Sequence, residues 1–289
     1  MLVVALAAAG CTIGDDGAPG EQPSGTASPS APPSPVRAAP TGQASGRAQP
    51  ATDPLQAALD RAVARVPGQA GIAVAGGGRV VAAGNVTGLP AWSTSKVPLV
   101  MAALDRAGTT EPTAAMRAAI TRSDNDAAES IWASLGPPAK AGIAVQQVLR
   151  AGGDRDTVVQ FSRVRPEYSA FGQTQWDDGP AATFAARLPC SPSGRTAAAL
   201  MREVEANQQW GAFGLSGAQS VGVKGGWGPG TDGAYMVRQL AVLQTARGYT
   251  GVMLSARPAD GAFTSGKAAL TRLADTLRDQ LGLLPAGTC

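Results

Sequence analysis

Two short patterns in the sequence bring together side chains that could perform nucleophilic catalysis. Ser93 and Lys96 are three positions apart, so on a helix they share one face and the amine could take the hydroxyl proton. Chance alone predicts about 0.25 such pairs in a chain of this composition, and a helix cap followed by a solvated lysine is the alternative. Ser123-Asp124-Asn125 is rarer, with about 0.01 occurrences expected, although capping of the helix that follows would also explain it.

The scarcity of lysine draws attention to a third pattern. The chain has four lysines against twenty arginines, and of the two residue types only lysine can lose its proton inside a protein. One of the four begins Lys224-Gly225-Gly226, which follows a short apolar run at 221–223 that is expected to be a strand. Lysine before glycine is also common in turns, so this motif is informative only beside the other two.

The composition excludes several other catalytic classes. The chain has no histidine, which removes Ser-His-Asp and Cys-His nucleophiles and every histidine-containing metal site. Its three widely spaced cysteines cannot form a cysteine-only zinc site, so no metal and no cofactor is expected. A net charge of +3 without a basic run predicts no nucleic-acid partner. A general base must therefore be Lys, Glu, Asp or Tyr.

The rest of the sequence supplies the elements that position these residues. Apolar side chains at helical spacing predict one helix after Asp53 and another that closes the chain. Residues 93–150 are expected to be mostly helical, with interruptions at Pro98 and at Pro137-Pro138. Short apolar runs predict two hairpins. The paired runs are 71–75 with 80–83 and 234–243 with 251–256.

These elements predict the architecture. Because hairpins lie towards both ends, we expect the two ends of the folded region to share one sheet. Residues 53–289 then form one α+β domain with an inserted helical lobe. Trp176 and Trp210 are expected in its core.

In this order the three motifs resemble those of class A β-lactamases and penicillin-binding peptidases, over roughly residues 55–285. The local match is best from Ala118 to Ala128. The resemblance implies an α+β, β-lactamase/transpeptidase-like fold in which helices flank an antiparallel sheet. Only 30 positions separate Ser93 from Ser123, fewer than is usual in that family, so the helical lobe is expected to be reduced.

The resemblance also implies a role for each motif residue. Ser93 is the nucleophile that opens an acyl bond and forms an ester, and Lys96 is its base or part of the proton relay. Ser123 passes a proton to the leaving nitrogen, while Asn125 holds the substrate amide.

The third motif supplies the groups that hold the substrate. Lys224 is expected to bind the substrate carboxylate and to act electrostatically on Ser123. Gly226 and Trp227 are assigned to substrate binding, and the backbone N–H groups of Ser93 and Trp227 are expected to form the oxyanion hole.

Two departures from the family pattern bear on the activity. Gly225 replaces the Thr or Ser of Lys-Thr-Gly, which removes a hydroxyl that helps to grip the carboxylate. Glu167 lies in the region of the family's deacylating base, but Phe171 stands where the pattern has asparagine. Glu167 is therefore either a hydrolytic base or a solvated loop residue.

The N-terminal residues predict where the protein resides. Residues 1–11 are small or apolar and end at Cys11, which resembles a bacterial lipobox, although a basic leader is missing. Residues 12–52 contain eight prolines and almost no large apolar side chain, so they are expected to be a disordered linker. Together they predict an exported, monomeric protein that is anchored through lipidated Cys11 to the outer face of the cell membrane.

The two other cysteines are expected to pair. With Cys11 lipidated, Cys190 and Cys289 remain as a pair in an oxidising compartment. Two buried unpaired cysteines are the alternative.

Three functions follow from these patterns. The leading hypothesis is a lipid-anchored serine hydrolase of the β-lactamase type, which acts through an acyl-enzyme on β-lactams or related small-molecule or peptide amides. A D-Ala peptidase or transferase of the cell wall needs no glutamate base. A non-catalytic envelope lipoprotein that keeps the fold is the third.

Overall fold

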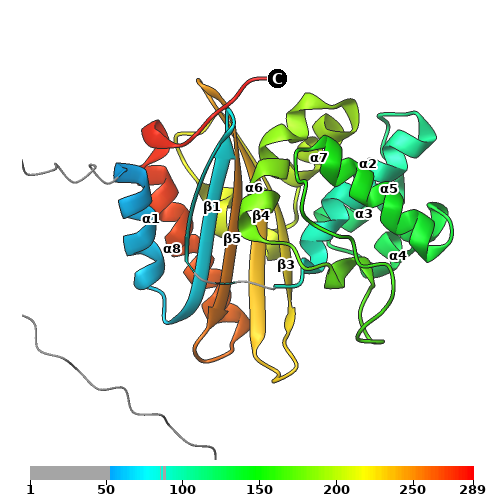
Figure 1. The fold of residues 1–289 in the computed structure, drawn as a ribbon, viewed down its shortest axis with the longest axis horizontal. Coiled ribbons are helices and arrows are strands. Elements are labelled where there is room, and N and C mark those ends of the chain that lie inside the picture. The colour runs from blue at the N-terminus through cyan, green and yellow to red at the C-terminus, as the bar shows by residue number, and fades with distance from the viewer. Residues whose placement is uncertain (1–52, 85, 87–88) are drawn as a thin grey trace, which may run out of the picture. The chain divides into compact units, whose positions relative to one another are not determined.

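The computed structural model describes residues 53–84, 86 and 89–289, and they form a layered α+β structure around one antiparallel sheet (Figure 1). The strand order is β2-β1-β5-β4-β3. Helices α1 (Pro54–Ala64) and α8 (Phe263–Asp279) cover one face, and α6 (Asp178–Arg187) packs on the other, against β1 and β5. The predicted signal segment 1–11 and linker 12–52 lie outside the described residues.

Both predicted hairpins are confirmed. The first joins β1 (Gly68–Gly76) to β2 (Arg79–Gly84), and the second joins β4 (Tyr235–Thr245) to β5 (Gly248–Pro258). Gly77 and Gly78 form the first turn with φ of 55° and 82°, the positive values that a type I′ hairpin turn requires.

The early and late parts of the chain share this sheet, as predicted. β1 pairs with β5, where Ile72 lies opposite Leu254, and β3 (Ser220–Pro229) forms the far edge beside β4. Side chains alternate along β1, so Ile72 and Val74 join the core under α1 and α8, whereas Ala73 and Ala75 join the core on the helical side. The sheet therefore separates two hydrophobic cores.

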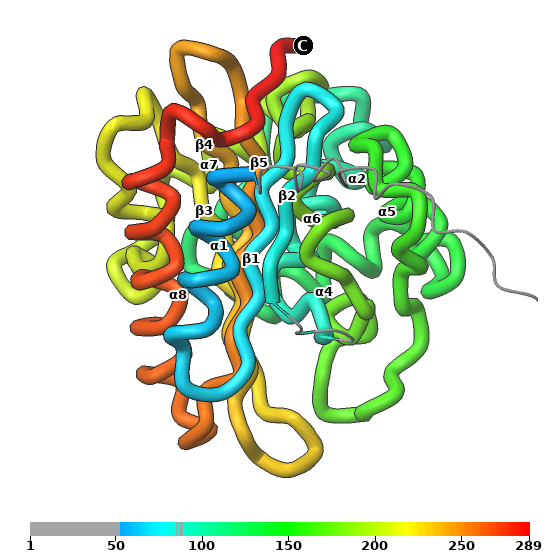
Figure 2. Tube along the Cα trace, turned by 60° about the vertical axis from the view of Figure 1, so that its left-hand side comes forward, coloured from blue at the N-terminus to red at the C-terminus, as the bar shows by residue number. Residues whose placement is uncertain are grey.

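The middle of the chain forms the helical side of the molecule (Figure 2). Its helices are α2 (Lys96–Ala107), α3 (Ala114–Thr121), α4 (Asn125–Ser134), α5 (Pro138–Ala151), α6 and α7 (Pro192–Arg202). The predicted interruption at Pro98 is wrong. Pro98 lies in the first turn of α2, where a backbone N–H has no partner within the helix, so its loss costs little.

The predicted pairing of Cys190 with Cys289 is confirmed as a disulfide. Cys190 ends a short 3₁₀ helix, Leu188–Cys190, on the helical side. The bridge therefore fixes the C-terminal residues to the middle of the chain. In the same tail, Tyr249 and Gly287 exchange two backbone hydrogen bonds of 2.7 and 3.0 Å.

Candidate active site

A strained turn presents the proposed nucleophile. Ser93 lies in the 3₁₀ helix Trp92–Ser95, directly before α2. Trp92 has a φ of 48°, which is unfavourable for a residue with a side chain, and such strain persists only where the surroundings enforce it. The hydroxyl of Ser95 donates to the Trp92 carbonyl at 2.6 Å, and that of Thr94 donates to the Ala91 carbonyl at 2.6 Å. Within the described part of the chain the Ser93 hydroxyl has no such backbone bond, and it lines a cavity.

Lys96 begins α2, and its amine is almost fully buried, with 1% of the residue exposed. Burial lowers the pKa of Lys96 to about 8, although the negative charges of Asp124 and Glu129 counteract it. Its Nζ donates to the Ser123 carbonyl at 2.6 Å and to Asn125 Oδ1 at 2.7 Å. Near neutral pH this amine therefore exists partly in the neutral form that can accept a proton.

The Ser123-Asp124-Asn125 motif joins α3 to α4, and its residues have different structural roles. Asp124 caps α4 by accepting a 2.9 Å hydrogen bond from the Ala127 N–H, as the capping alternative expected. Ser123 has a left-handed backbone, with φ of 60°. Its Oγ lies 3.4 Å from Lys96 Nζ. Asp124 therefore caps α4, while Ser123, whose backbone is strained, places its hydroxyl near Lys96.

A second buried lysine approaches the same hydroxyl from the sheet. Lys224 lies inside β3 and has no exposed surface. Its Nζ is 2.8 Å from Ser123 Oγ, 2.7 Å from Gln208 Oε1 and 2.8 Å from the Gly225 carbonyl. Burial, and then the nearby charge of Lys96, lower the pKa of Lys224 well below its usual value. Two amines with lowered pKa values thus converge on Ser123.

Gln208 is a site residue that the sequence analysis missed. It is fully buried in the 3₁₀ helix Ala206–Gln208, and its Nε2 donates to the Thr121 carbonyl at 2.8 Å, which directs its Oε1 to Lys224. Nothing distinguishes Gln208 from its polar neighbours in the sequence, because only the fold brings residues 16 positions apart to one amine.

A cavity of about 290 Å³ opens beside the nucleophile. Three of the predicted site residues other than Ser93 and Lys96 also line it, namely Asn125, Glu167 and Trp227. The complete lining is Trp92, Ser93, Lys96, Asn125, Asp126, Glu129, Arg163, Glu167, Tyr168, Ser169, Phe171, Gly172 and Trp227. Ser123 and Lys224 are not part of this lining.

Gly226 allows β3 to lie directly against the nucleophile's turn. A Cβ atom at this position would come within 2.9 Å of the Ala91 carbonyl and within 3.0 Å of the Ser93 backbone nitrogen. No other residue type fits without moving the turn. The contact places the Lys224-Gly225-Gly226 strand next to Ser93.

Glu167 lies at the cavity wall, but its carboxylate pairs with Arg165. Its side chain is 55% exposed and forms an ion pair with Arg165 at 3.0 Å. A backbone hydrogen bond, followed by the contacts with Arg165, lowers the pKa of Glu167. Phe171 is buried against Trp132, with ring centroids 5.3 Å apart, so it presents carbon where the family pattern has an amide. A carboxylate with a lowered pKa is a weak base.

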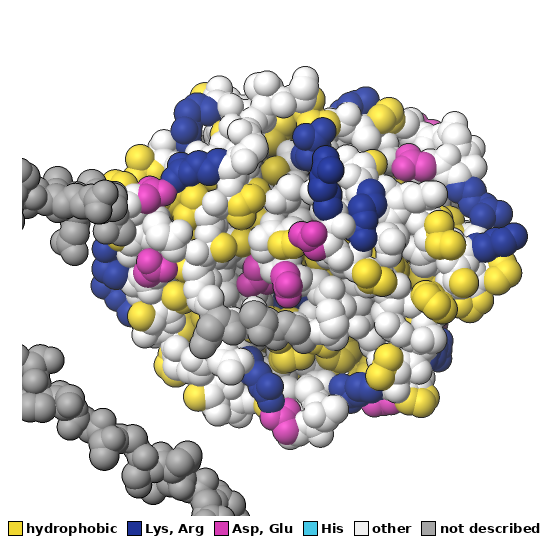
Figure 3. Space-filling view, viewed as in Figure 1, with side chains coloured by type: hydrophobic (Ala, Val, Ile, Leu, Met, Phe, Trp, Pro, Cys, Tyr) yellow, Lys and Arg dark blue, Asp and Glu magenta, His cyan; other side chains and the backbone are white. Residues whose placement is uncertain are grey.

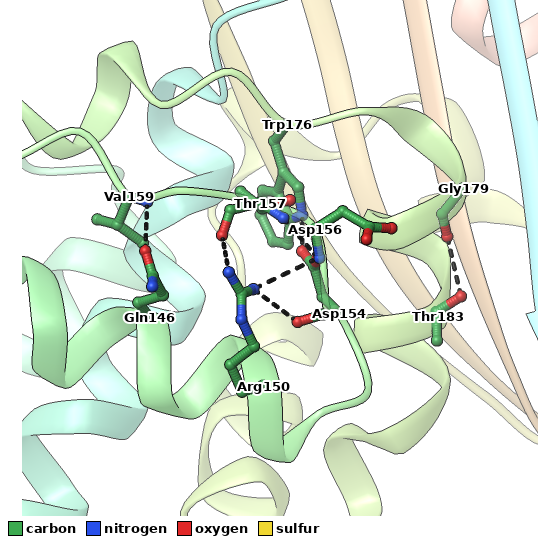
Figure 4. Close-up of polar contacts among 9 residues, drawn as sticks. All are labelled: Gln146, Arg150, Asp154, Asp156, Thr157, Val159, Trp176, Gly179 and Thr183. Atoms are coloured by element: carbon green, nitrogen blue, oxygen red, sulfur yellow. Dashed lines mark hydrogen bonds and ion pairs between the residues drawn. The ribbon is translucent and has the colours of Figure 1, made fainter.

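Polar contacts hold the first residues of the loop 155–170, which carries Glu167 further along the chain (Figure 4). Buried Asp154 accepts hydrogen bonds from Trp176 Nε1 at 2.8 Å and from the Thr157 N–H at 3.0 Å. Arg150 donates to the Thr157 carbonyl at 2.6 Å. Val159 of this loop is buried in the core, whereas three other large apolar side chains are exposed, and apolar surface is visible over the helical side in Figure 3. These exposed residues are Val158, Phe161 and Val164.

None of the described helices is both long and apolar enough to cross a bilayer. In the same part of the chain, no three acidic or cysteine side chains are close enough together to hold a metal ion.

Comparison with known proteins identifies the fold. Neither a protein-family profile nor a curated protein matches the chain. Among solved structures, a variant of the class A β-lactamase of the last common ancestor of Gram-negative bacteria is 21% identical. It has a TM-score of 0.59 and covers 79% of this chain and 98% of its own. A putative class A β-lactamase from Rhodopseudomonas palustris is 20% identical, with a TM-score of 0.60 over 78% and 98%.

A β-lactamase from Xanthomonas campestris gives similar values. It is 18% identical, with a TM-score of 0.58, and the match covers 79% of this chain and 97% of that one. Identities of this size establish the architecture rather than the chemistry. The chain has the α+β fold of the class A β-lactamases.

Proposed function

We propose that this protein is a serine hydrolase that acts through an acyl-enzyme on Ser93. The observation that carries the proposal is the convergence of two buried amines on one hydroxyl beside the nucleophile. Lys224 Nζ lies 2.8 Å and Lys96 Nζ 3.4 Å from Ser123 Oγ. Burying two lysines without carboxylate partners in hydrogen-bond contact is costly, and such an arrangement is typical of a site that transfers protons.

The reaction begins with transfer of the Ser93 hydroxyl proton to neutral Lys96. The Ser93 oxygen bonds to the substrate carbonyl carbon, and the carbonyl oxygen takes the negative charge beside the Ser93 and Trp227 N–H groups. When the bond to the leaving group breaks, Ser123 donates its proton to that group. Protonated Lys96, whose Nζ lies 3.4 Å from Ser123 Oγ, then returns the proton to Ser123, which leaves an ester on Ser93.

In the uncomplexed site Lys96 bonds to the Ser123-Asp124-Asn125 segment rather than to Ser93. Catalytic hydrogen bonds are often completed only when substrate is bound, so this geometry is compatible with the proposed proton transfer. Hydrolysis of the ester needs a base that activates water. Glu167 is engaged by Arg165, so we propose that acylation is faster than deacylation.

Covalent labelling tests the proposal. The full chain is incubated with a fluorophosphonate and with a β-lactam, and intact mass is measured. We expect one adduct on the wild type and none on Ser93→Ala. If the wild type gains no adduct from either reagent, the proposed chemistry is wrong and a non-catalytic lipoprotein becomes the better explanation.

We also propose that the protein is exported and held on the outer face of the membrane through a lipid on Cys11. Support comes from the apolar residues before Cys11, the proline-rich segment after it, and the disulfide, since disulfides persist in oxidising compartments. Cys11→Ala is expected to move the protein from the membrane fraction to the soluble one. A Cys11→Ala protein that still sediments with membranes would contradict the anchor.

A further inference from the structure

We infer that the site selects esters and amides whose leaving group is apolar and carries no carboxylate, and that Trp210 and Gly225 determine this preference. The inference rests on the proposed function, because it concerns the substrate class of the same site. It departs from the role that the resemblance assigns to Lys224, which is to bind a substrate carboxylate.

The hydrogen-bonding capacity of Lys224 is already used. Three acceptors surround this Nζ within 2.8 Å, namely Ser123 Oγ, Gln208 Oε1 and the Gly225 carbonyl. A lysine amine has at most three N–H donors, in its protonated form, so no donor is left over in either protonation state. Gln208 cannot turn away freely, since its Nε2 is held by the Thr121 carbonyl. A carboxylate would have to displace one of these acceptors and enter a position with no exposed surface.

Aromatic carbon fills the space beside Gly225, the residue that follows Lys224 in β3. A Cβ atom on Gly225 would lie 2.7 Å from Cζ2 of Trp210 and 3.2 Å from Cζ3 of Trp227. The hydroxyl that the family pattern places here therefore has no room. Trp210, which was expected in the core, packs against the core under α1 and α8, but it is only partly buried and also lies over this strand.

Trp210 is held in this position by its neighbours. Its Nε1 donates to the Asn207 carbonyl at 3.1 Å, and its own carbonyl accepts from Gln239 Nε2 at 2.7 Å. Its ring meets the edge of Trp227 with centroids 6.2 Å apart. A bound carboxylate would thus meet two fixed indoles rather than a mobile side chain.

The charges around the cavity also disfavour an anion. Asp126, Glu129 and Glu167 line it with three carboxylates, against the cationic groups of Arg163 and Lys96. Arg163 is paired with Glu129 at 3.0 Å, and the Lys96 amine is bonded within the protein. No lining cation of the described chain is therefore free to receive a carboxylate.

The position of the indoles indicates which part of the substrate they meet. Ser123 protonates the leaving group in the proposed reaction, and Lys224 of β3 lies beside Ser123. The leaving group is therefore on the side of β3, where Trp227 lines the cavity and Trp210 lies against Gly225. An apolar leaving group buries its surface against these rings, whereas a carboxylate there would lose its hydration without gaining a partner.

The test compares benzylpenicillin with its methyl ester, which differ in the carboxylate alone. The second-order rate of acylation of the full chain is measured for each by intact mass and divided by the rate of hydroxide hydrolysis of the same compound. We expect the methyl ester to react faster by about tenfold or more, the ratio that one lost charge-assisted hydrogen bond produces.

Two variants test whether the indole of Trp210 causes the preference for substrates without a carboxylate. Gly225→Thr alone is expected to unfold at lower temperature, because its side chain meets Trp210. Gly225→Thr with Trp210→Ala removes that clash and restores the hydroxyl, so it should shift the rate ratio towards benzylpenicillin by about tenfold. Thermal unfolding of each variant shows whether it is folded.

The outcomes separate the two proposals. A wild type that is acylated faster by benzylpenicillin than by its methyl ester overturns this inference and leaves the proposed function intact. A double variant that folds and keeps the wild-type ratio overturns the role of Trp210 and Gly225. A wild type that reacts with neither compound nor with a fluorophosphonate contradicts the proposed function, and the inference fails with it.

Discussion

The pKa of Lys96 leads to a prediction about the pH dependence of acylation. Burial holds this pKa at about 8 against an ordinary value of 10.5, which is on the order of 3 kcal/mol of destabilisation of the charged form. Only the neutral amine can take the Ser93 proton. About one tenth of the molecules have it at pH 7, so the acylation rate should rise about tenfold per pH unit below 8 and level off above it.

Glu129→Gln shifts this profile in a direction fixed by charge. The carboxylate of Glu129 raises the pKa of Lys96 by stabilising the ammonium form, so its removal lowers that pKa. Because this carboxylate is partly solvent-exposed, the pKa of Lys96 falls only moderately, and the neutral fraction at pH 7 increases. We expect the rate at pH 7 to rise about two- to fivefold while the plateau at high pH stays unchanged.

The assay measures the rate of fluorophosphonate labelling of the full chain between pH 5.5 and 10. The pH at the midpoint of this rate profile is compared between the variants. Glu203→Gln is the matched control, because it removes an exposed carboxylate that pairs with Arg117 at 3.7 Å and does not act on Lys96. Lys96→Arg keeps a positive charge but cannot serve as a base, so its labelling should be nearly abolished. A flat profile in the wild type, or an alkaline shift in Glu129→Gln, would refute the assignment of Lys96 as the base.

The remaining predictions concern turnover and stability. A β-lactam should give a burst of about one equivalent followed by slow turnover, and Glu167→Gln should leave that turnover within about twofold; a large loss would make Glu167 the base. Cys190→Ser with Cys289→Ser should lower the free energy of unfolding by about 4–5 kcal/mol, measured in urea, since the bridge spans 99 positions. Asp178→Ala should lower it by about 3–5 kcal/mol, because it leaves Arg238 buried without its 2.8 Å partner; a loss below about 1 kcal/mol would contradict this.

The architecture could be predicted from the sequence because its signals are local. Alternating and helical apolar spacing indicated the hairpins and the terminal helices, and hairpins at both ends implied a shared sheet. Pro98 misled this reading because its effect depends on its position within the helix. In the first turn of a helix the backbone N–H has no partner within the helix, so a proline there breaks no hydrogen bond. Whether a proline interrupts a helix therefore depends on its distance from the first helical residue.

The site could be predicted only where a motif carries the chemistry. Ser-x-x-Lys and Ser-Asp-Asn identified the residues that meet around Ser123, but Gln208 completes the coordination of Lys224 from a segment without a motif. The position of the Trp210 ring could not be predicted for the same reason. A tryptophan is usually a core residue, and Trp210 does pack against the core under α1 and α8, but only the fold shows that its ring also lies over Gly225.

The two departures from the family pattern have a common physical character. At Gly225 an indole occupies the volume of an expected hydroxyl, and at Phe171 a buried ring stands in place of an expected amide. Each change replaces a polar group that would hold a carboxylate or a water, while the groups proposed to attack and protonate the substrate, Ser93, Lys96 and Ser123, are retained. Carbon cannot accept or donate the missing hydrogen bonds, so neither function can be recovered by a small shift of these side chains. A site altered in this way is suited to forming an ester between Ser93 and an uncharged substrate and to hydrolysing that ester slowly.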